Sequence, residues 1–279
     1  MKKALVIGTM LVASLSAQNL QAPLGQYANF VIESPVQSID LLQTNNKSYK
    51  IGVDYLYDNT DAIGTHFINI PVQALITENI YLEATLPFKY LSIDSYDNES
   101  GLSDIMIGGA YSFGSMQSGN SLNVLGLRYN FESGQDHVDA PSSSLDFYWD
   151  TMGKISDFTL RSGLLFNYAF GYDDSISSIS VDGGLNSLLS IGLGHECLFT
   201  EALETNAIVS WYSSYGDSTA FGDIPGTSYD IVDLTLKWDT LKLNNRQISF
   251  GAKIPLYSTS FNGDDYKSFT FFVSASGLF

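Results

Sequence analysis

The sequence predicts an all-β protein, a transmembrane antiparallel β-barrel of about 12 strands (about 10 to 14) with short periplasmic turns and long extracellular loops. The first observation is that segments of about ten residues alternate apolar and polar side chains from Lys47 onward. The second is that short and long connectors alternate between these segments. The third is an N-terminal export signal. A soluble β-sandwich would explain the alternation, but neither of the other two observations.

Residues 1–17 have the plan of a secretory signal peptide. Lys2 and Lys3 precede an apolar run over residues 4–15, and small residues follow at the expected cleavage site. A short buried helix is the alternative. No later run reaches the roughly 18 apolar residues of a membrane-spanning helix. We therefore expect an exported protein without a helical anchor, located in the bacterial outer membrane.

Residues 18–46 show no clear period, and "SIDLLQT" is expected to form a short helix from Ser38. We predict that this segment is periplasmic or acts as a plug. Residues 47–279 are the predicted barrel. Its expected strands are YKIGVDYLYD, INIPVQALI, IYLEATLPFKY, SDIMIGGAYSF, NVLGLRYNF, LDFYWDTMG, FTLRSGLLFNYAF, GLNSLLSIGLGHECLF, ETNAIVSWYS, YDIVDLTLKW, QISFGAKIPLY and SFTFFVSASGLF.

The last strand alternates as far as the final residue, Phe279. It must pair with the first strand, near Tyr49–Asp58, because a spanning sheet in hydrocarbon cannot leave an edge unpaired. Phe272 is the aromatic exception on its polar face and is expected to point into the lumen. Phe279 resembles the C-terminal aromatic signal that outer-membrane assembly machinery recognises, which makes that machinery an expected partner.

The connectors form two classes. Sequences such as TEN, KISD and TEA are short, whereas DNTDAIGT, ESGQDHVDAPSSS and STSFNGDDY are long and acidic. This asymmetry is typical of outer-membrane barrels. Outer-membrane lipids and lipopolysaccharide are therefore expected partners, and aromatic girdle residues are expected near strand ends. These are Tyr57, Tyr90, Phe113, Trp149, Phe170, Trp211 and Trp238.

Charged residues in the strands lie on the faces opposite the apolar ones, and we predict that they line the lumen. Two interpretations stay open: the charges line a water-filled pore, or they pair across a narrow interior and fill it. The predicted lumen-lining residues are Lys50, Asp54, Glu83, Lys89, Asp104, Arg128, Asp146, Asp150, Arg161, Glu196, Glu204, Asp233, Lys237 and Lys253.

Pro71, Pro87 and Pro255 fall inside strand patterns. A proline lacks the N–H that a strand needs, so each is expected to mark a bulge or kink. The sharper hypothesis is a break in the wall at Pro71 and Pro87, through which an apolar solute leaves sideways. The simpler one, a local bulge near the rim, is favoured.

Composition excludes several classes of function. A net charge of −17 argues against nucleic-acid binding, and a single cysteine, Cys197, gives no intramolecular disulfide. His66, His137 and His195 have no nucleophile at a telling spacing, which disfavours an outer-membrane lipid hydrolase. We expect no catalytic residues, no cofactor and no metal site, and therefore no enzyme. Acidic loops such as "DNTD" give only a weak calcium or magnesium signal.

The stretch "SGLSDIMIGGAYSF", with Gly101, Leu102 and Asp104, resembles the outer-membrane proteins associated with phenol meta-cleavage pathways. These are proposed transporters, distantly akin to the long-chain fatty-acid channels. Ser103 stands where that pattern has glycine. The resemblance spans about Lys47 to Phe279 and implies uptake of hydrophobic or aromatic small molecules. It implies no catalytic residues.

The predicted function is therefore an outer-membrane channel or transporter for passive uptake of small solutes, with hydrophobic or aromatic ones implied by the resemblance. The alternative is a structural or surface-interaction barrel without an open pore. The few aromatic residues on the polar faces, Tyr81, Tyr148, Tyr212 and Phe272, temper the aromatic-uptake hypothesis.

Overall fold

The computed structural model describes most of the chain from residue 30 onward. The described residues are 30–60, 63–93, 98–116, 121–132, 142–174, 179–196, 198–200, 202–215, 218–219, 222–223, 228–240, 245–259 and 268–279. The predicted signal peptide, residues 18–29, His137 and Cys197 lie outside them. Within the described ranges, none of the helices combines the length and apolar character needed to cross a membrane.

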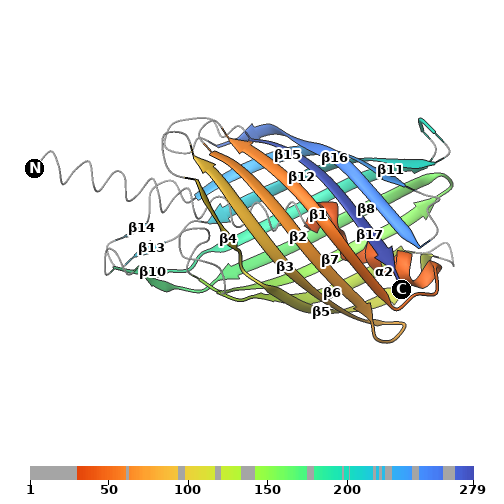
Figure 1. The fold of residues 1–279 in the computed structure, drawn as a ribbon, viewed down its shortest axis with the longest axis horizontal. Helices are drawn as coiled ribbons and strands as arrows, with labels where there is room; N and C mark the ends of the chain where they lie inside the picture. The colour runs from red at the N-terminus through yellow and green to blue at the C-terminus, as the bar shows by residue number, and fades with distance from the viewer. Residues whose placement is uncertain are drawn as a thin grey trace, which may run out of the picture.

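Twelve long antiparallel strands form one closed barrel (Figure 1), as predicted. A short strand, β4 (Glu99–Leu102), extends the line of β5 along β3. The long strands are β1 (Tyr49–Thr60), β2 (Ile63–Leu75), β3 (Ile80–Ile93), β5 (Met106–Gly114), β6 (Ser121–Asn130), β7 (Ser144–Ile155), β8 (Phe158–Ala169), β11 (Leu185–Glu196), β12 (Leu203–Tyr215), β15 (Ser228–Thr240), β16 (Arg246–Ser258) and β17 (Ser268–Leu278).

The last strand closes the barrel on the first. β1 and β17 pair from Lys50↔Leu278 to Thr60↔Ser268, which confirms the predicted partner. Beyond that ladder, Phe279 N donates to Tyr49 O at 2.8 Å, and the N–H groups of Ser48 and Tyr49 donate to Phe279 O at 3.0 Å. Closure leaves neither terminal strand with a free hydrogen-bonding edge.

Side chains alternate between the outside and the inside of the barrel along the long strands, apart from the irregular register of β16 near Pro255. On β1, Tyr49, Ile51 and Val53 are 46–52% exposed, whereas Lys50 and Asp54 are each 3% exposed. This is the pattern that a pleated strand between lipid and an enclosed interior requires. The polarity is thus inverted relative to a soluble protein, with apolar side chains outside and charged ones inside.

Short and long connectors alternate as predicted, with one difference. At the rim where β1 begins and β17 ends, here called the C-terminal rim, residues 76–79 join β2 to β3 and residues 156–157 join β7 to β8. At the opposite rim, β1 runs to Thr60 and β2 starts at Ile63, so the "DNTDAIGT" connector is not a long loop. Two other predicted loops contain short strands, β9 (Tyr172–Asp174), β10 (Ile179–Asp182), β13 (Ser218–Thr219) and β14 (Gly222–Asp223), which form a separate small sheet.

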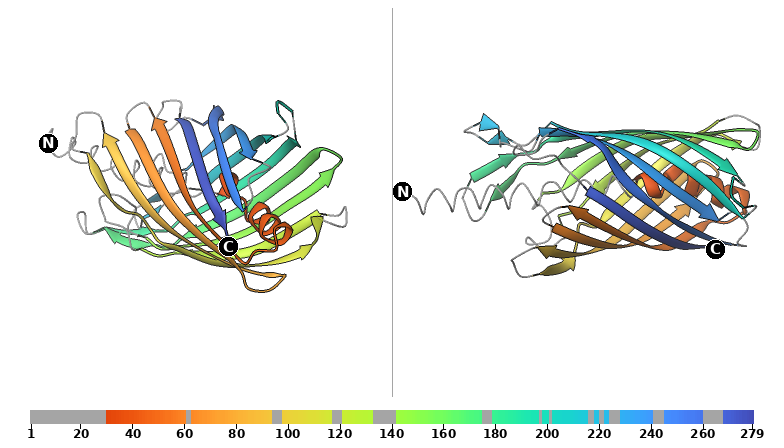
Figure 2. Two further views of the ribbon diagram at one scale, coloured as in Figure 1. Left: turned by 45° about the vertical axis from the view of Figure 1, so that its right-hand side comes forward. Right: turned by 90° about the horizontal axis from the view of Figure 1, so that it is seen from above.

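Residues 30–43 lie buried or half-buried within the barrel and include most of helix α2 (Pro35–Thr44), which packs near the C-terminal rim (Figure 2). The helix starts three residues before the predicted Ser38. Ser34 caps it by accepting a hydrogen bond from Gln37 N at 3.4 Å, and proline at the first helical position needs no partner for an N–H. Val36, Ile39 and Leu42 are fully buried.

Apolar side chains of this segment join two clusters with the barrel wall. Phe30 packs edge-on against Tyr148 of β7, with ring centroids 5.6 Å apart. Ile32 clusters with Leu56, Phe67 and Phe272, and Phe272 is 1% exposed. The expectation that Phe272 points inward is confirmed.

Two of the three strand prolines lie beside changes of register. The β15–β16 pairing shifts between Val232 and Asp233, and Asp233 lies opposite Pro255. Beside Pro87, the neighbouring chain takes four steps from Leu102 to Met106 while β3 takes three from Phe88 to Thr85. One extra residue is therefore accommodated, as in a β-bulge.

Pro71 differs from the other two prolines. The β1–β2 pairing keeps one register on either side of it, from Ile51↔Val72 to Asp54↔Asn69. Gly52 of β1 lies beside the ring, and an added Cβ there would be 3.2 Å from Pro71 Cγ. The sideways exit at Pro71 and Pro87 stays a prediction.

Candidate functional site: the polar interior of the barrel

Twelve of the fourteen predicted lumen-lining residues are buried within the barrel. Asp104 is half-buried in the irregular stretch between β4 and β5. Glu196 is half-buried at the C-terminal rim, where it pairs with the exposed Lys154. The buried twelve are Lys50, Asp54, Glu83, Lys89, Arg128, Asp146, Asp150, Arg161, Glu204, Asp233, Lys237 and Lys253.

The sequence reasoning missed two buried wall carboxylates and the polar residues of the inner segment. Asp58 and Asp239 are 7% and 2% exposed, and they continue the polar faces that carry Asp54 and Lys237. Strict alternation would have found both. Glu33 and Gln37 could not be predicted in this way, because their segment shows no periodic pattern of apolar and polar residues.

One buried group joins three strands around Arg128. Arg128 Nε and Nη2 donate to Glu83 Oε1 and Oε2 at 2.8 and 3.0 Å, and Tyr148 OH donates to Glu83 Oε1 at 2.7 Å. The guanidinium also lies over two rings, 4.5 Å from the centroid of Tyr148 and 5.3 Å from that of Phe30. The inner segment thus packs directly against a buried ion pair.

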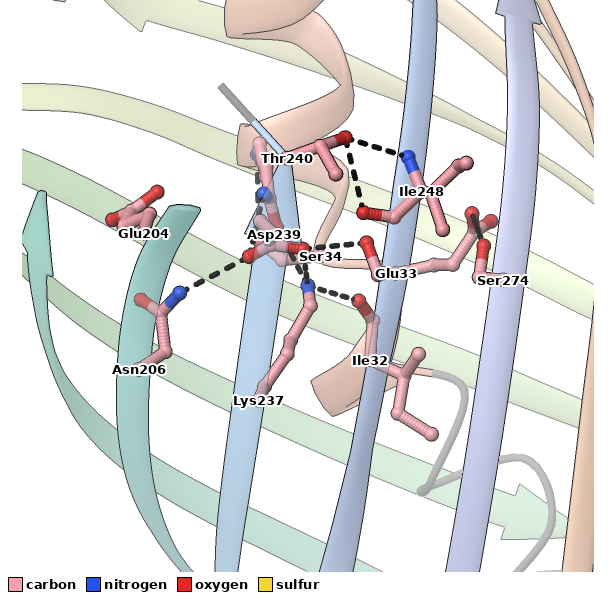
Figure 3. A network of polar contacts seen from close by, with 12 residues as sticks. Ile32, Glu33, Ser34, Glu204, Asn206, Lys237, Asp239, Thr240, Ile248 and Ser274 are labelled. Carbon is pink, nitrogen blue, oxygen red and sulfur yellow. Dashed lines mark hydrogen bonds and ion pairs between the residues drawn. The ribbon is translucent and has the colours of Figure 1, made fainter. Parts of the chain in front are cut away.

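A second group surrounds the side chain of Gln37 on α2. Its Oε1 accepts from Arg161 Nη1 at 2.7 Å and from Lys237 Nζ at 3.0 Å, and its Nε2 donates to Asp239 Oδ2 at 3.2 Å. Asp239 also accepts from Asn206 Nδ2 and Ser249 Oγ. Figure 3 shows Lys237 and Asp239 side by side on β15 with Asn206 on the neighbouring strand.

The inner segment has further anchors on other strands. Asp150 accepts from Ser34 Oγ at 2.5 Å and from Val36 N at 3.0 Å. Lys50 Nζ donates to Glu33 Oε1 at 3.1 Å and to Ser38 Oγ at 3.2 Å. Another donor from the wall, Lys237 Nζ, reaches the backbone carbonyl of Ile32 at 2.5 Å (Figure 3). These bonds come from β1, β7 and β15, so the segment is held on several sides.

Burial also affects the one ionisable group of α2. The pKa of the Asp40 carboxyl is raised, chiefly by desolvation, against the opposing effect of the hydrogen bond from Thr44 Oγ1.

Polar pairs continue away from the segment. Lys253 pairs with Asp233 at 3.3 Å, and Thr270 Oγ1 donates to Asp58 at 2.7 Å. Asn167 bridges Asp146 and Asn186, whose side-chain oxygen accepts from Tyr212 OH. The interior therefore contains many paired polar groups beside the two apolar clusters, and in the described part of the chain it also contains buried polar atoms without a hydrogen-bond partner, such as Gln73 Oε1.

The outer surface carries the predicted aromatic side chains. Phe113, Trp149, Phe170 and Trp211 are 39–52% exposed. His66 lies on this surface among tyrosines, and its Nδ1 is 2.8 Å from Tyr55 OH. His195 lies edge-on to Phe158. Across the described ranges, no cluster of three or more His, Cys, Asp and Glu residues has a metal-binding arrangement.

Comparison with solved structures identifies the type of barrel. The COG4313 outer membrane channel from Pseudomonas putida F1 superposes with a TM-score of 0.68 at 10% identity, over 84% of this chain and 96% of that one. The NanC porin superposes with a TM-score of 0.55 at 8% identity, over 81% and 98% of the two chains. This chain has the fold of a bacterial outer-membrane β-barrel. The translocator domain of the autotransporter NalP from Neisseria meningitidis is also similar, with a TM-score of 0.54, 13% identity and coverage of 94% and 98%.

No family model and no curated protein matches the chain. The resemblance to the phenol meta-pathway proteins therefore stays a prediction. The location in the outer membrane rests on the closed barrel, its apolar exterior and its likeness to these barrels.

Proposed function

We propose that this outer-membrane barrel is a passive channel for small solutes, and that residues 30–44 close it until they move. The proposal rests on how the segment is held inside the barrel. The segment is held inside by hydrogen bonds and ion pairs to Asp150, Lys50 and the Arg161–Lys237–Asp239 group, while the wall itself is complete without it.

The charged residues of the wall support a water-filled pathway through the barrel. Among the residues that the structure describes, six Lys and Arg side chains are buried in the barrel, namely Lys50, Lys89, Arg128, Arg161, Lys237 and Lys253. Burying so many charges is costly unless each is paired or solvated. Charges of both signs along the wall favour passage of polar solutes in water. The aromatic or hydrophobic solutes implied by the sequence resemblance would have to follow the two apolar clusters of the interior, to which the inner segment itself contributes side chains such as Phe30 and Ile32.

A disulfide that ties the segment to the wall tests the proposal. Ser34 and Asp150 are in side-chain contact. We suggest the pair Ser34→Cys and Asp150→Cys in a Cys197→Ser background, with each single cysteine variant as its control. In planar bilayers, the oxidised double variant is expected to conduct no current, and reduction with dithiothreitol is expected to restore stepwise conductance.

The alternative is a structural or surface-interaction barrel that never opens, and the dense pairing of interior charges favours it. Absence of conductance and of liposome swelling for every reduced variant and for the wild type would support this alternative. Equal conductance before and after reduction would show instead that solutes pass without displacement of the segment.

A further inference from the structure

We propose that Arg161, Lys237 and Asp239 form a binding site for the carboxamide group of a transported solute, and that Gln37 occupies this site when the channel is closed. The inference rests on the proposed channel function. Its basis is that the wall contacts both polar atoms of the Gln37 side chain, with two cationic donors on the oxygen and one anionic acceptor on the nitrogen.

The geometry fixes the orientation of the amide. The carbonyl oxygen lies 2.7 Å from Arg161 Nη1 and 3.0 Å from Lys237 Nζ, and the NH₂ group lies 3.2 Å from Asp239 Oδ2. A flipped amide would point its donors at two cations and its oxygen at a carboxylate. Charge-assisted hydrogen bonds on both ends therefore specify an acceptor next to a donor.

The charge balance of the site favours a neutral dipolar group over an ion. Arg161 and Lys237 contribute two positive charges, and Asp239 and Glu204 contribute two negative ones within 3.2–4.0 Å of them. A carboxylate would match the two cations but would face the Asp239 carboxylate where the amide places its NH₂. A single hydroxyl can both accept and donate, but it does so through one oxygen and cannot fill the two separate positions that the amide oxygen and nitrogen occupy. The carboxamide satisfies both without adding charge.

The site also offers contacts that Gln37 does not use. Arg161 Nε and Asn206 Oδ1 are buried, and within the described part of the chain neither has a hydrogen-bond partner. Arg161 is 8% exposed and Asn206 is fully buried. One further donor and one further acceptor beside the amide position suit a solute that is more polar than a glutamine side chain, such as a hydroxylated amide.

The four wall residues come from three strands of the barrel, of which β12 and β15 are neighbours and β8 is separated from β12 by β11. Arg161 lies on β8, Asn206 on β12, and Lys237 and Asp239 lie on β15. The strands fix them independently of α2, because none of them belongs to the segment that moves. The site is therefore expected to persist when Gln37 leaves.

The test uses three solutes that differ at one functional group: gluconamide, gluconate and sorbitol. Gln37→Ala removes the competing carboxamide and leaves the wall unchanged. Binding to this variant in detergent micelles is measured by saturation-transfer NMR. Gluconamide is expected to bind at least about tenfold more tightly than gluconate or sorbitol, since it alone makes the full set of charge-assisted bonds.

Two wall variants locate the site. Adding Arg161→Met or Lys237→Met to Gln37→Ala is expected to weaken gluconamide binding about tenfold or more. Lys253→Met is the matched control, because Lys253 is also buried and ion-paired but pairs with Asp233 away from Gln37. Heat-dependent mobility on denaturing gels verifies that each variant is folded. If one of the two wall variants misfolds, the other still tests whether the site binds gluconamide.

Equal binding of the three solutes, or undiminished gluconamide binding in the folded wall variants, would overturn the site. Conductance of the same Gln37→Ala protein separates this outcome from failure of the channel proposal. Current without preference for gluconamide would contradict the proposed binding site but not the channel. Gluconamide binding without any current would support the binding site and contradict the channel.

Discussion

Glu83 on β3 and Arg128 on β6 form a two-point ion pair inside the barrel, with donor–acceptor distances of 2.8 and 3.0 Å, across the intervening strand β5. Gly108 of β5 lies between them. An added Cβ there would lie 2.8 Å from Arg128 Cγ and 3.1 Å from Glu83 Cγ. The glycine thus allows two side chains that are not on adjacent strands to meet.

Arg128→Met is expected to destabilise the barrel by about 3–5 kcal/mol, because it leaves the Glu83 carboxylate buried without its cation. The measurement is the free energy of unfolding in urea in lipid vesicles. Lys154→Met is the matched control, since the Lys154–Glu196 pair lies at the exposed rim and an exposed pair contributes only about 0–1 kcal/mol. Equal losses for the two variants would contradict the assignment of a buried pair. The double variant Glu83→Leu/Arg128→Met is expected to recover most of the loss.

Gly108→Ala is expected to disrupt the same pair by sterics alone. Its methyl group would also lie 2.8 Å from the backbone oxygen of Leu127, which cannot move as a side chain can. We expect a loss of about 1–3 kcal/mol from overpacking, measured by the same unfolding assay. Gly153→Ala is the control, because its added methyl group would meet only Ser121 Cβ at 3.8 Å. A neutral Gly108→Ala would show that β5 and its neighbours shift freely.

Ser34→Ala is expected to loosen the inner segment while the barrel stays folded. The substitution removes the hydroxyl donor to Asp150 and the cap of α2. Hydrogen bonds to charged groups contribute about 1.5–3 kcal/mol, so the open fraction is expected to rise by about tenfold or more. Single-channel open probability is the measurement. Thr44→Ala, which removes only an exposed bond within the helix to Asp40, is expected to leave that probability unchanged.

Deletion of Phe279 is expected to reduce the amount of assembled barrel more than Phe279→Ala does. The backbone of Phe279 accepts from Ser48 and Tyr49 and donates to Tyr49, whereas its side chain is 65% exposed. The deletion therefore removes closure bonds as well as the proposed aromatic assembly signal, and the alanine variant removes only the latter. Quantification of folded protein in outer-membrane fractions tests both, and wild-type amounts of both variants would contradict the proposed role of Phe279 in assembly.

The alternation of apolar and polar residues along the strands was enough to predict most of the fold. It predicted the closed barrel, the pairing of β17 with β1 and the inward Phe272 because lipid outside and a polar interior impose one period on every strand. The same rule, applied more strictly, would have found Asp58 and Asp239. The helix start was missed because Ser34 and Pro35 precede the apolar residues from which a helix is usually recognised.

The contacts around Gln37 had no signature in the sequence. Gln37 and Asp239 are 202 residues apart, and Arg161 reaches the same amide from a second strand, β8. Periodicity indicates which face a residue occupies, but not which residues face one another across a closed barrel. That depends on strand order, register and tilt together.

The sequence by itself determined that these strands form a barrel in the outer membrane. Along each strand, apolar residues that face lipid alternate with polar residues that face the interior, and this alternation can be read directly from the sequence. Only the tertiary structure decided what lies inside. The inner segment has no period of its own, and its position follows from the sum of separate bonds to β1, β7, β8 and β15, which come together only when the barrel closes.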